Sequence, residues 1–360
     1  MVVSQITILQ ILDGGVTSMK YAVGYQLAEG NEELFTDIID PFLKDISEVY
    51  FPWLDLPSGR SSLINRRGHV YWKGQERLEE ELRLLHKNGI KLDLLLNANC
   101  FGKYSISQYL CNNVCSILEH LNDAVGGVDI VTTASPMIAH VVKKHFPQVE
   151  VRASVNMRIG TVKGMQYVAH LFDSFYIQRE YNRDFEKIRE LKNWAENNNK
   201  KMLMLANSGC MNYCSGQTFH DNMVSHEAEI GETCNISDFT PYMCWNYLKD
   251  RKNWALILQN SWIRPEDMHN YKDYFDVVKL ATRMHSLPGM VIQSYVKGEY
   301  FGNLLDLFEP GFGPALAPYV IDNKRFPDDW FKTTSTCKKN CHECSYCSEI
   351  LGKTLINAEG

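Results

Sequence analysis

The sequence predicts an α/β protein built on a (β/α)8 TIM-type barrel with a cysteine-rich C-terminal extension. Eight short apolar runs recur along the chain, and amphipathic helical patterns separate them. Alternating strand and helix patterns indicate βα units in a parallel sheet, and eight strands are enough to close a barrel. A doubly wound open sheet is the alternative, because a strand count does not establish closure. No Gly-x-Gly-x-x-Gly motif follows the first run, which weakens a dinucleotide-binding version of that alternative.

The predicted strands are rich in β-branched or aromatic residues and have few polar interruptions. Strands that are buried on both faces of a parallel sheet have this composition. In chain order they are YAVGYQ (21–26), EVYFPW (48–53), KLDLLLNA (91–98), VDIVTTA (128–134), EVRASVN (150–156), FDSFYIQ (172–178), KMLMLAN (201–207) and FDVVKLATR (275–283).

Helical patterns with an apolar face lie between these runs, for example over 31–46, 75–90 and 184–199. The pattern over 75–90 ends with Lys87, Asn88 and Gly89, directly before the third strand. Glycine in this position is a common helix stop. The connections are therefore those of successive βα units.

Composition and charge restrict the class of protein. Hydrophobic residues make up 45% and charged residues 22% of the 360 residues, as in ordinary globular proteins. The formal charge of −6 argues against a broad nucleic-acid-binding surface. No apolar run approaches the roughly 20 residues that a membrane-spanning helix needs. We expect no membrane association and a cytoplasmic location.

The predicted organisation has three parts. Residues 1–18 lack the features of a signal peptide and are interpreted as a leader or a wrongly assigned start, with Met19 as the true start. A short first strand or cap is the other interpretation of this segment. The barrel is expected over 19–310, and the cysteine-rich extension over 311–360.

Eleven cysteines in a chain without an export signal indicate metal binding or redox chemistry rather than disulfides. Cys111 and Cys115 are the exception, because they lie four residues apart in a helical pattern. Cysteine in a helix commonly packs as a small hydrophobic residue. For this pair the sequence favours core packing over ligation.

The first cysteine group begins directly after the seventh strand, in a long irregular stretch over 208–238. Long loops inside compact domains are usually functional. Iron–sulfur clusters are held by thiolates that are partly close in sequence and partly remote, whereas compact zinc sites usually have two short cysteine pairs. The spacing therefore favours an iron–sulfur cluster over zinc. The group consists of Cys210, Cys214, Cys234 and Cys244.

The second group is denser, with four cysteines in CKKNCHECSYC near the C-terminus. Its members are Cys337, Cys341, Cys344 and Cys347. This run predicts a metal centre that is a second cluster or zinc, or that lends a ligand to the first cluster.

Polar and charged residues follow most of the predicted strands. In a barrel, the carboxyl ends of the strands meet at one face, where chemistry collects. Unpaired cations on a buried strand are costly, so such residues are expected to meet an anion, and arginine can bind a carboxylate through two hydrogen bonds. The candidates for binding a substrate are Arg60, Asn97, Asn156, Arg179, Lys279 and Arg283.

The chain resembles the U32 peptidase-like family. The resemblance covers most of the chain from Met19 and rests on VGYQL (23–27), EVYFPWLDLPSGR (48–60), NSGCMNYC (207–214), Cys244 followed by WIRPEDMHNY (262–271), and FDVVKLATR (275–283). It implies a barrel with a 4Fe–4S cluster at Cys210, Cys214, Cys244 and, as a further ligand, Cys234. Similar members act in oxygen-independent hydroxylation of ubiquinone precursors or RNA bases. The dense C-terminal cysteine run departs from those members and suggests a distinct branch.

Three functions follow as hypotheses. The first is an iron–sulfur-dependent redox enzyme or enzyme subunit, which acts on a small anionic substrate or an RNA or metabolite, by oxygen-independent hydroxylation or a related modification. The resemblance also leaves room for a protein partner of the same family. The second is a U32-type peptidase, although the sequence has no Ser-His-Asp order, nucleophile elbow or zinc-protease helix. The third is a non-catalytic electron-transfer or scaffolding protein.

Overall fold

The computed structural model describes residues 19–54, 56–60 and 71–359. The predicted leader over 1–18 lies outside these residues. Eight parallel strands form a closed barrel, in which β1 pairs with both β2 and β8. The barrel is thus confirmed, and every predicted strand region contains or overlaps an observed strand. The strands are β1 (Lys20–Gly24), β2 (Ile46–Pro52), β3 (Lys91–Leu96), β4 (Ile130–Thr133), β5 (Glu150–Ala153), β6 (Ser174–Tyr176), β7 (Lys201–Leu205) and β8 (Val277–Lys279).

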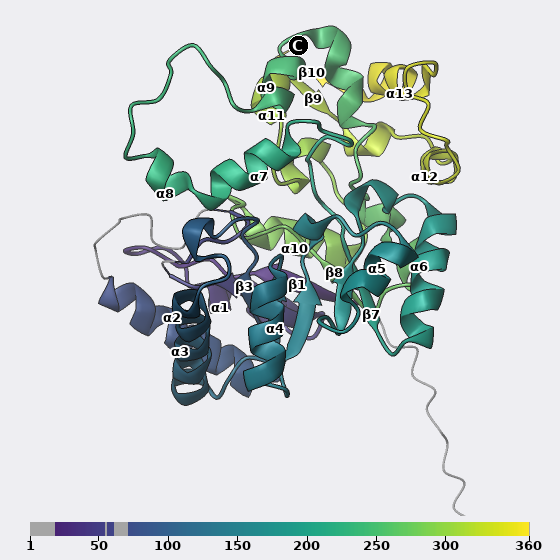
Figure 1. Cartoon of the computed structure of the whole chain (residues 1–360). Helices are drawn as coiled ribbons and strands as arrows, with labels where there is room; N and C mark the ends of the chain where they lie inside the picture. The colour runs from purple at the N-terminus through teal and green to yellow at the C-terminus, as the bar shows by residue number, and fades with distance from the viewer. Residues whose placement is uncertain (1–18, 55, 61–70, 360) are drawn as a thin grey trace, which may run out of the picture.

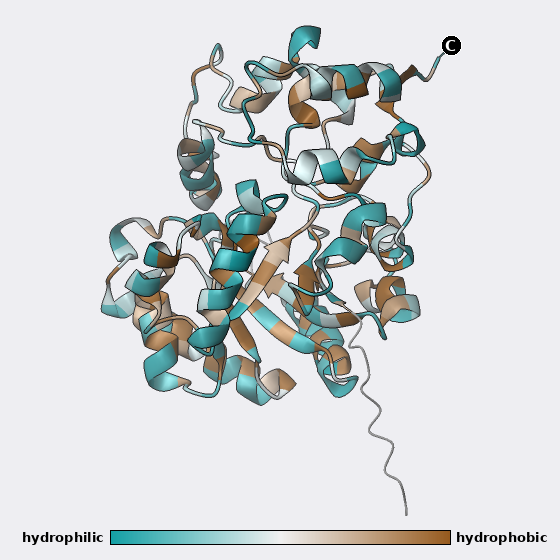
Figure 2. Cartoon of the chain, turned by 90° about the vertical axis from the view of Figure 1, so that its right-hand side faces the viewer, coloured by the Kyte–Doolittle hydropathy of each residue, from teal (hydrophilic) through white to brown (hydrophobic). Residues whose placement is uncertain are grey.

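Helices surround the barrel and alternate with its strands (Figure 1). In Figure 2 they carry both hydrophilic and hydrophobic segments, as helices with one buried face do. Ser107, Ser135, Thr161 and Asp184 cap four of them by accepting hydrogen bonds from the first turn. The surrounding α-helices are α1 (Phe35–Ile39), α2 (Trp72–Lys87), α3 (Gln108–Val125), α4 (Pro136–His145), α5 (Val162–Val168), α6 (Phe185–Asn197) and α10 (Pro288–Lys297).

Short 3-10 helices join many of these elements. They are η1 (Asp40–Phe42), η2 (Gly102–Tyr104), η3 (Val155–Met157), η4 (Arg179–Tyr181), η5 (Arg251–Ile257), η6 (Pro265–Tyr271), η7 (Leu304–Leu307) and η8 (Asn323–Arg325). Two of them, η3 and η4, directly follow barrel strands and carry candidate residues Asn156 and Arg179.

The stretch over 208–238 is less irregular than predicted, because it contains α7 (Gln217–Ser225) and α8 (Glu227–Ile230). A weak apolar pattern hid these helices: only Gln217 and Ser225 of α7 are buried, and both are polar. They lie over the barrel end together with α9 (Met243–Leu248), as Figure 1 shows.

The C-terminal segment packs onto the barrel instead of forming a separate core. Its elements are α11 (Gly313–Leu316), β9 (Tyr319–Ile321), α12 (Trp330–Ser335), α13 (Tyr346–Thr354) and β10 (Leu355–Asn357), and β9 pairs antiparallel with β10. Trp330 stacks on Trp262, with ring centroids 5.9 Å apart. Both belong to the same hydrophobic cluster as the barrel strands.

Buried ions fill part of the barrel interior. Arg152 of β5 binds Glu48 of β2 through both terminal nitrogens, at 2.6 and 3.1 Å, and contacts Glu150 at 2.8 Å. Asp93 lies 3.9 Å from the same guanidinium, and burial raises its pKa to about 6.

No helix in the described part of the chain is long and apolar enough to span a membrane.

Candidate functional site

A cavity of about 880 Å³ opens at the carboxyl ends of the strands, between the barrel and the C-terminal segment. This is the face at which barrel enzymes place their active sites. All six residues that the sequence proposed for substrate binding line the cavity: Arg60, Asn97, Asn156, Arg179, Lys279 and Arg283. Long-range folding therefore brings together residues from five barrel strands or the loops that follow them.

Two arginines on one wall differ in their partners. Arg60 Nε donates to Glu309 Oε1 at 3.1 Å. Arg283 is buried and donates through Nη1 to the Ser58 hydroxyl at 3.0 Å. Burial lowers the pKa of Arg283 to about 10, although Glu309 opposes that shift. Among the described residues, no carboxylate lies within ion-pair distance of Arg283.

Lys279 lies on the cavity floor at the end of β8. Its Nζ atom stands 3.7 Å from the centroid of the Tyr50 ring, a cation–π contact. The ammonium forms no hydrogen bond or ion pair with any residue that the structure describes. Burial lowers its pKa to about 8, even though Asp93 acts in the opposite direction.

The two amide candidates lie beside the loop that carries Arg60. Asn97 Oδ1 accepts a hydrogen bond from the Gly59 amide at 2.9 Å, and Asn156 Nδ2 donates to the Asn97 carbonyl at 3.3 Å. A Cβ atom on Gly59 would lie 2.5 Å from Asn156 Nδ2, so a larger residue there would displace the Asn156 amide. The amides hold the Arg60 loop against strands β3 and β5.

Three of the predicted cysteine ligands, Cys210, Cys214 and Cys244, line the same cavity. Burial opposes ionisation of Cys210, but Arg179 and Arg60 lower the pKa of its thiol below the ordinary value. Burial, and then the nearby Cys210 and Cys214, raise the pKa of Cys244. Cys234 is exposed and does not line the cavity.

Arg179 also belongs to this part of the wall. It is buried, donates to the Ser208 hydroxyl at 3.1 Å, and has no carboxylate within ion-pair distance among the described residues. Arg179, Lys279 and Arg283 are thus three buried cations without a carboxylate in ion-pair distance among the described residues, although Arg179 also contacts the Cys210 thiol. Such cations are costly unless an anion meets them.

The second cysteine group lies in the C-terminal segment. Cys337, Cys341 and Cys344 are exposed, and Cys347 is half-buried at the start of α13. Burial raises the pKa of Cys347 to about 12, and the charges of the other three thiols act in the same direction while Arg183 opposes them. The four thiols are therefore close enough to influence one another.

In neither predicted cysteine group do three sulfur atoms lie as close together as the ligands of a single zinc ion. Zinc holds thiolates at about 2.3 Å, so its sulfur ligands stand about 4 Å apart. Within the described ranges, only Cys111, Cys115 and His145 bring three ligand atoms within 4.8 Å of one another. An iron–sulfur cluster is larger than a single ion and holds its cysteines farther apart.

Two contacts in or near the site were not predicted from the sequence: the ion pair of Arg60 with Glu309 and the pairing of Cys100 with His226. Glu309 pairs with Arg60 across 249 positions of the chain, and no local signal marks it. Cys100 follows β3, and a hydrogen bond from His226 lowers the pKa of its thiol. His226 Nδ1 in turn lies 3.0 Å from Glu229 Oε2.

Comparisons with known proteins give a consistent result. The model of peptidase family U32 matches residues 66–272. The uncharacterized protease MJ1657 of Methanocaldococcus jannaschii is 25% identical over 293 residues, which cover 80% of this chain and 84% of that protein. The solved structure of the U32 peptidase Mk0906 matches with a TM-score of 0.52 at 15% identity, over 73% of this chain and 92% of that one. That structural likeness supports the barrel fold.

Proposed function

The chain belongs to peptidase family U32, and from that premise we propose that it is an iron–sulfur-dependent redox enzyme or enzyme subunit. The observation that carries the proposal is the content of one cavity: three thiols, and three buried cations that have no carboxylate in ion-pair distance among the described residues. Cys210, Cys214 and Cys244 would hold a 4Fe–4S cluster. When bound, the cluster would supply one-electron transfer to or from a molecule in the cavity.

The donor set fits this cofactor. Thiolates bind iron–sulfur clusters, and the lowered pKa of Cys210 favours its thiolate. Arg60 and Arg179 offset the negative charge that several thiolates bring into a buried site. The apolar side chains of Met211, Trp245 and Phe308 also line the cavity and limit solvent contact, which tunes such centres.

The substrate is proposed to be a small anion, or a larger molecule with an anionic group. Lys279 and Arg283 would bind that group, while Asn97 and Asn156 orient the remainder through their amides. Oxygen-independent hydroxylation is the proposed reaction class, by similarity to family members. A protein partner of the same family and a cytoplasmic location remain parts of this proposal.

The test is iron and acid-labile sulfide analysis of the full chain after anaerobic purification. Cys210→Ser, Cys214→Ser and Cys244→Ser should each lose the iron and sulfide of one 4Fe–4S cluster, about four of each per chain. The Cys111→Ser variant, altered outside the cavity, serves as the control and should retain both. Unchanged iron in all three cavity variants would overturn the ligand set.

The Cys234→Ser variant tests whether a fourth cysteine completes the cluster's ligand set or whether one iron lacks a cysteine ligand. If Cys234→Ser loses iron as the cavity variants do, the loop that carries it supplies the fourth ligand. If iron and sulfide are unchanged, three cysteines suffice, and one coordination position faces the substrate cavity.

The C-terminal cysteines are proposed as a second metal centre, a cluster or zinc. Cys341→Ser is the informative variant, because Cys341 is electrostatically coupled to its neighbours and lines a small cavity with Cys337 and Cys347. Loss of about half the iron would identify a cluster, and loss of zinc alone would identify a zinc centre. Retention of all metals would contradict both.

A second candidate function is peptide hydrolysis, which rests on Cys100, His226 and Glu229. The thiol, imidazole and carboxylate are arranged in the order of a nucleophile, a base and an orienting acid. Cys100→Ala should abolish hydrolysis of a peptide library while leaving iron content unchanged. Hydrolysis that survives this substitution would remove the candidate.

A further inference from the structure

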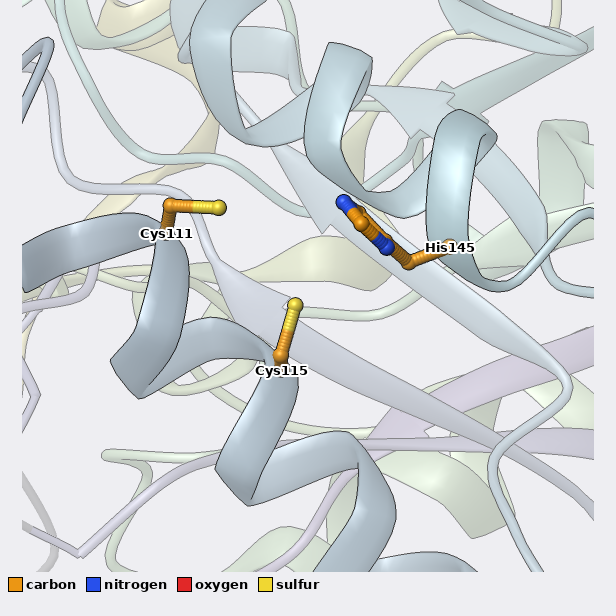
Figure 3. Close-up of side chains that lie close together, drawn as sticks. All are labelled: Cys111, Cys115 and His145. Carbon is orange, nitrogen blue, oxygen red and sulfur yellow. The ribbon is translucent and has the colours of Figure 1, made fainter. Parts of the chain in front are cut away.

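The outer surface of the barrel carries a third group of soft metal ligands. Cys111 and Cys115 lie four residues apart in α3, so their side chains share one face of the helix. His145 is the last residue of the neighbouring helix α4. One ligand atom from each of the three lies within 4.8 Å of the others. Figure 3 shows the imidazole ring on α4 directed toward the space beside the two sulfur atoms.

Ordinary packing explains only part of this arrangement. The half-buried thiols pack against the main hydrophobic cluster, as the sequence predicted. A histidine in the last turn is also favoured by the helix dipole. Neither effect directs the exposed imidazole of His145 toward two thiols. The ring makes no hydrogen bond or ion pair with any residue for which the structure gives a position.

We propose that Cys111, Cys115 and His145 bind one zinc ion, which joins α3 to α4. Two thiolates and one imidazole are a donor set that zinc accepts in tetrahedral geometry. Small side-chain rotations suffice to bring atoms within 4.8 Å to the spacing that zinc needs, about 4 Å or less between ligand atoms. The two thiolates balance the charge of the ion.

The site leaves one coordination position open. Three protein ligands converge among the described residues, and His145 is exposed, so water can occupy the fourth position. Glu119 follows Cys115 by one helical turn and adds negative charge close to that thiol. None of the three ligands lines the large cavity, so this site is independent of the proposed iron–sulfur centre.

Cobalt(II) is a suitable probe, because tetrahedral cobalt–thiolate sites absorb strongly where zinc does not. The anaerobically purified full chain would be titrated with cobalt(II) and then with zinc, and compared with His145→Ala, Cys111→Ser and Cys115→Ser. His140→Ala is the matched control, because His140 is an exposed histidine of the same helix. Subtracting each variant's cobalt binding from that of wild type removes the cobalt that binds to cysteines elsewhere in the chain.

Wild type and His140→Ala should bind about one more equivalent of cobalt than the three ligand variants do, and zinc should displace it. Zinc should also raise the melting temperature of wild type more than that of His145→Ala. Iron and sulfide should be equal in all five proteins. Equal cobalt binding and equal spectra in wild type and His145→Ala would overturn the proposal. So would loss of iron from Cys111→Ser, which would assign its thiol to the iron centre.

Discussion

Lys279 is a cation whose surroundings favour its neutral form. It is buried on the cavity floor, with an aromatic ring as its near contact and no ion-pair partner among the described residues. The side chain is therefore a cost to folding, and the proposed function gives it the role of binding an anion.

The pH dependence of stability should report this cost. In the unfolded chain the lysine keeps its proton up to its ordinary pKa of 10.5, whereas in the folded protein it loses the proton near 8. Between these values the unfolded state binds more protons, so the free energy of unfolding of wild type rises with pH relative to Lys279→Met. Denaturant titrations of both proteins across this range would measure the difference. A difference that does not vary with pH would contradict the buried cation.

Arg152 has the opposite role, because it neutralises acids inside the barrel. Replacing it with leucine leaves the buried Glu48 without its ion-pair partner and Glu150 with Lys201, and should lower the free energy of unfolding by about 3–5 kcal/mol. Lys192→Leu is the control, since it breaks only a surface pair with Glu196 and should cost less than about 1 kcal/mol. Urea denaturation at neutral pH compares the two. Similar losses would mean that the interior ions contribute no more than surface pairs.

At the scale of elements, the loop after β7 is held against the segment that follows η7. Gly209 donates its amide to the Glu309 carbonyl at 3.0 Å, and Ser208 forms a β-bridge with Glu309. This contact positions Cys210 beside Glu309 at the cavity. The fold thus ties the proposed ligand loop to residues about a hundred positions away.

Gly209 should tolerate no side chain. A Cβ atom there would stand 2.1 Å from the Pro310 carbonyl oxygen, so Gly209→Ala should separate the two segments, cost about 1–3 kcal/mol and reduce the iron content. Gly313→Ala is the matched control, because its nearest neighbour would be Asn303 at 3.9 Å. Thermal melts and iron analysis of both variants make the comparison. Normal iron content and normal stability of Gly209→Ala would contradict the proposed role of the contact between the Cys210 loop and the segment after η7.

The elements also show what the sequence can and cannot predict. The eight strands were predictable because strands buried on both faces are continuously apolar, and their carboxyl ends must converge once the barrel closes. Asn97, Arg179 and Lys279 were found from that rule alone. Glu309 was not, because its place depends on how the C-terminal segment folds back. His145 was missed for a similar reason, since only the packing of α3 against α4 brings it to the cysteines.

At the scale of the whole molecule, one hydrophobic cluster unites the barrel and the C-terminal segment. Trp262 and Trp330 stack at this junction, and the Arg183 guanidinium lies 4.4 Å from the Trp262 ring centroid. The junction closes one side of the region above the strands. The C-terminal cysteines are thereby fixed to the barrel rather than tethered by a linker.

Loss of this junction should destabilise the entire chain. Trp330 is 1% exposed, so Trp330→Ala should lower the free energy of unfolding by about 3–5 kcal/mol. Ile106→Ala, at a residue that is 89% exposed, should change it by less than about 0.5 kcal/mol. Calorimetry should show one shifted transition for Trp330→Ala. A separate early transition beside an unshifted main one would mean that the C-terminal segment folds independently.

The central claim is that the cysteines at the barrel mouth hold an iron–sulfur cluster. Its most direct test is electron paramagnetic resonance of the anaerobically purified full chain after reduction, with iron and sulfide measured on the same sample. The account predicts a signal of a reduced 4Fe–4S cluster and about four iron and four sulfide per cluster. Zinc without sulfide, and no such signal, would contradict it.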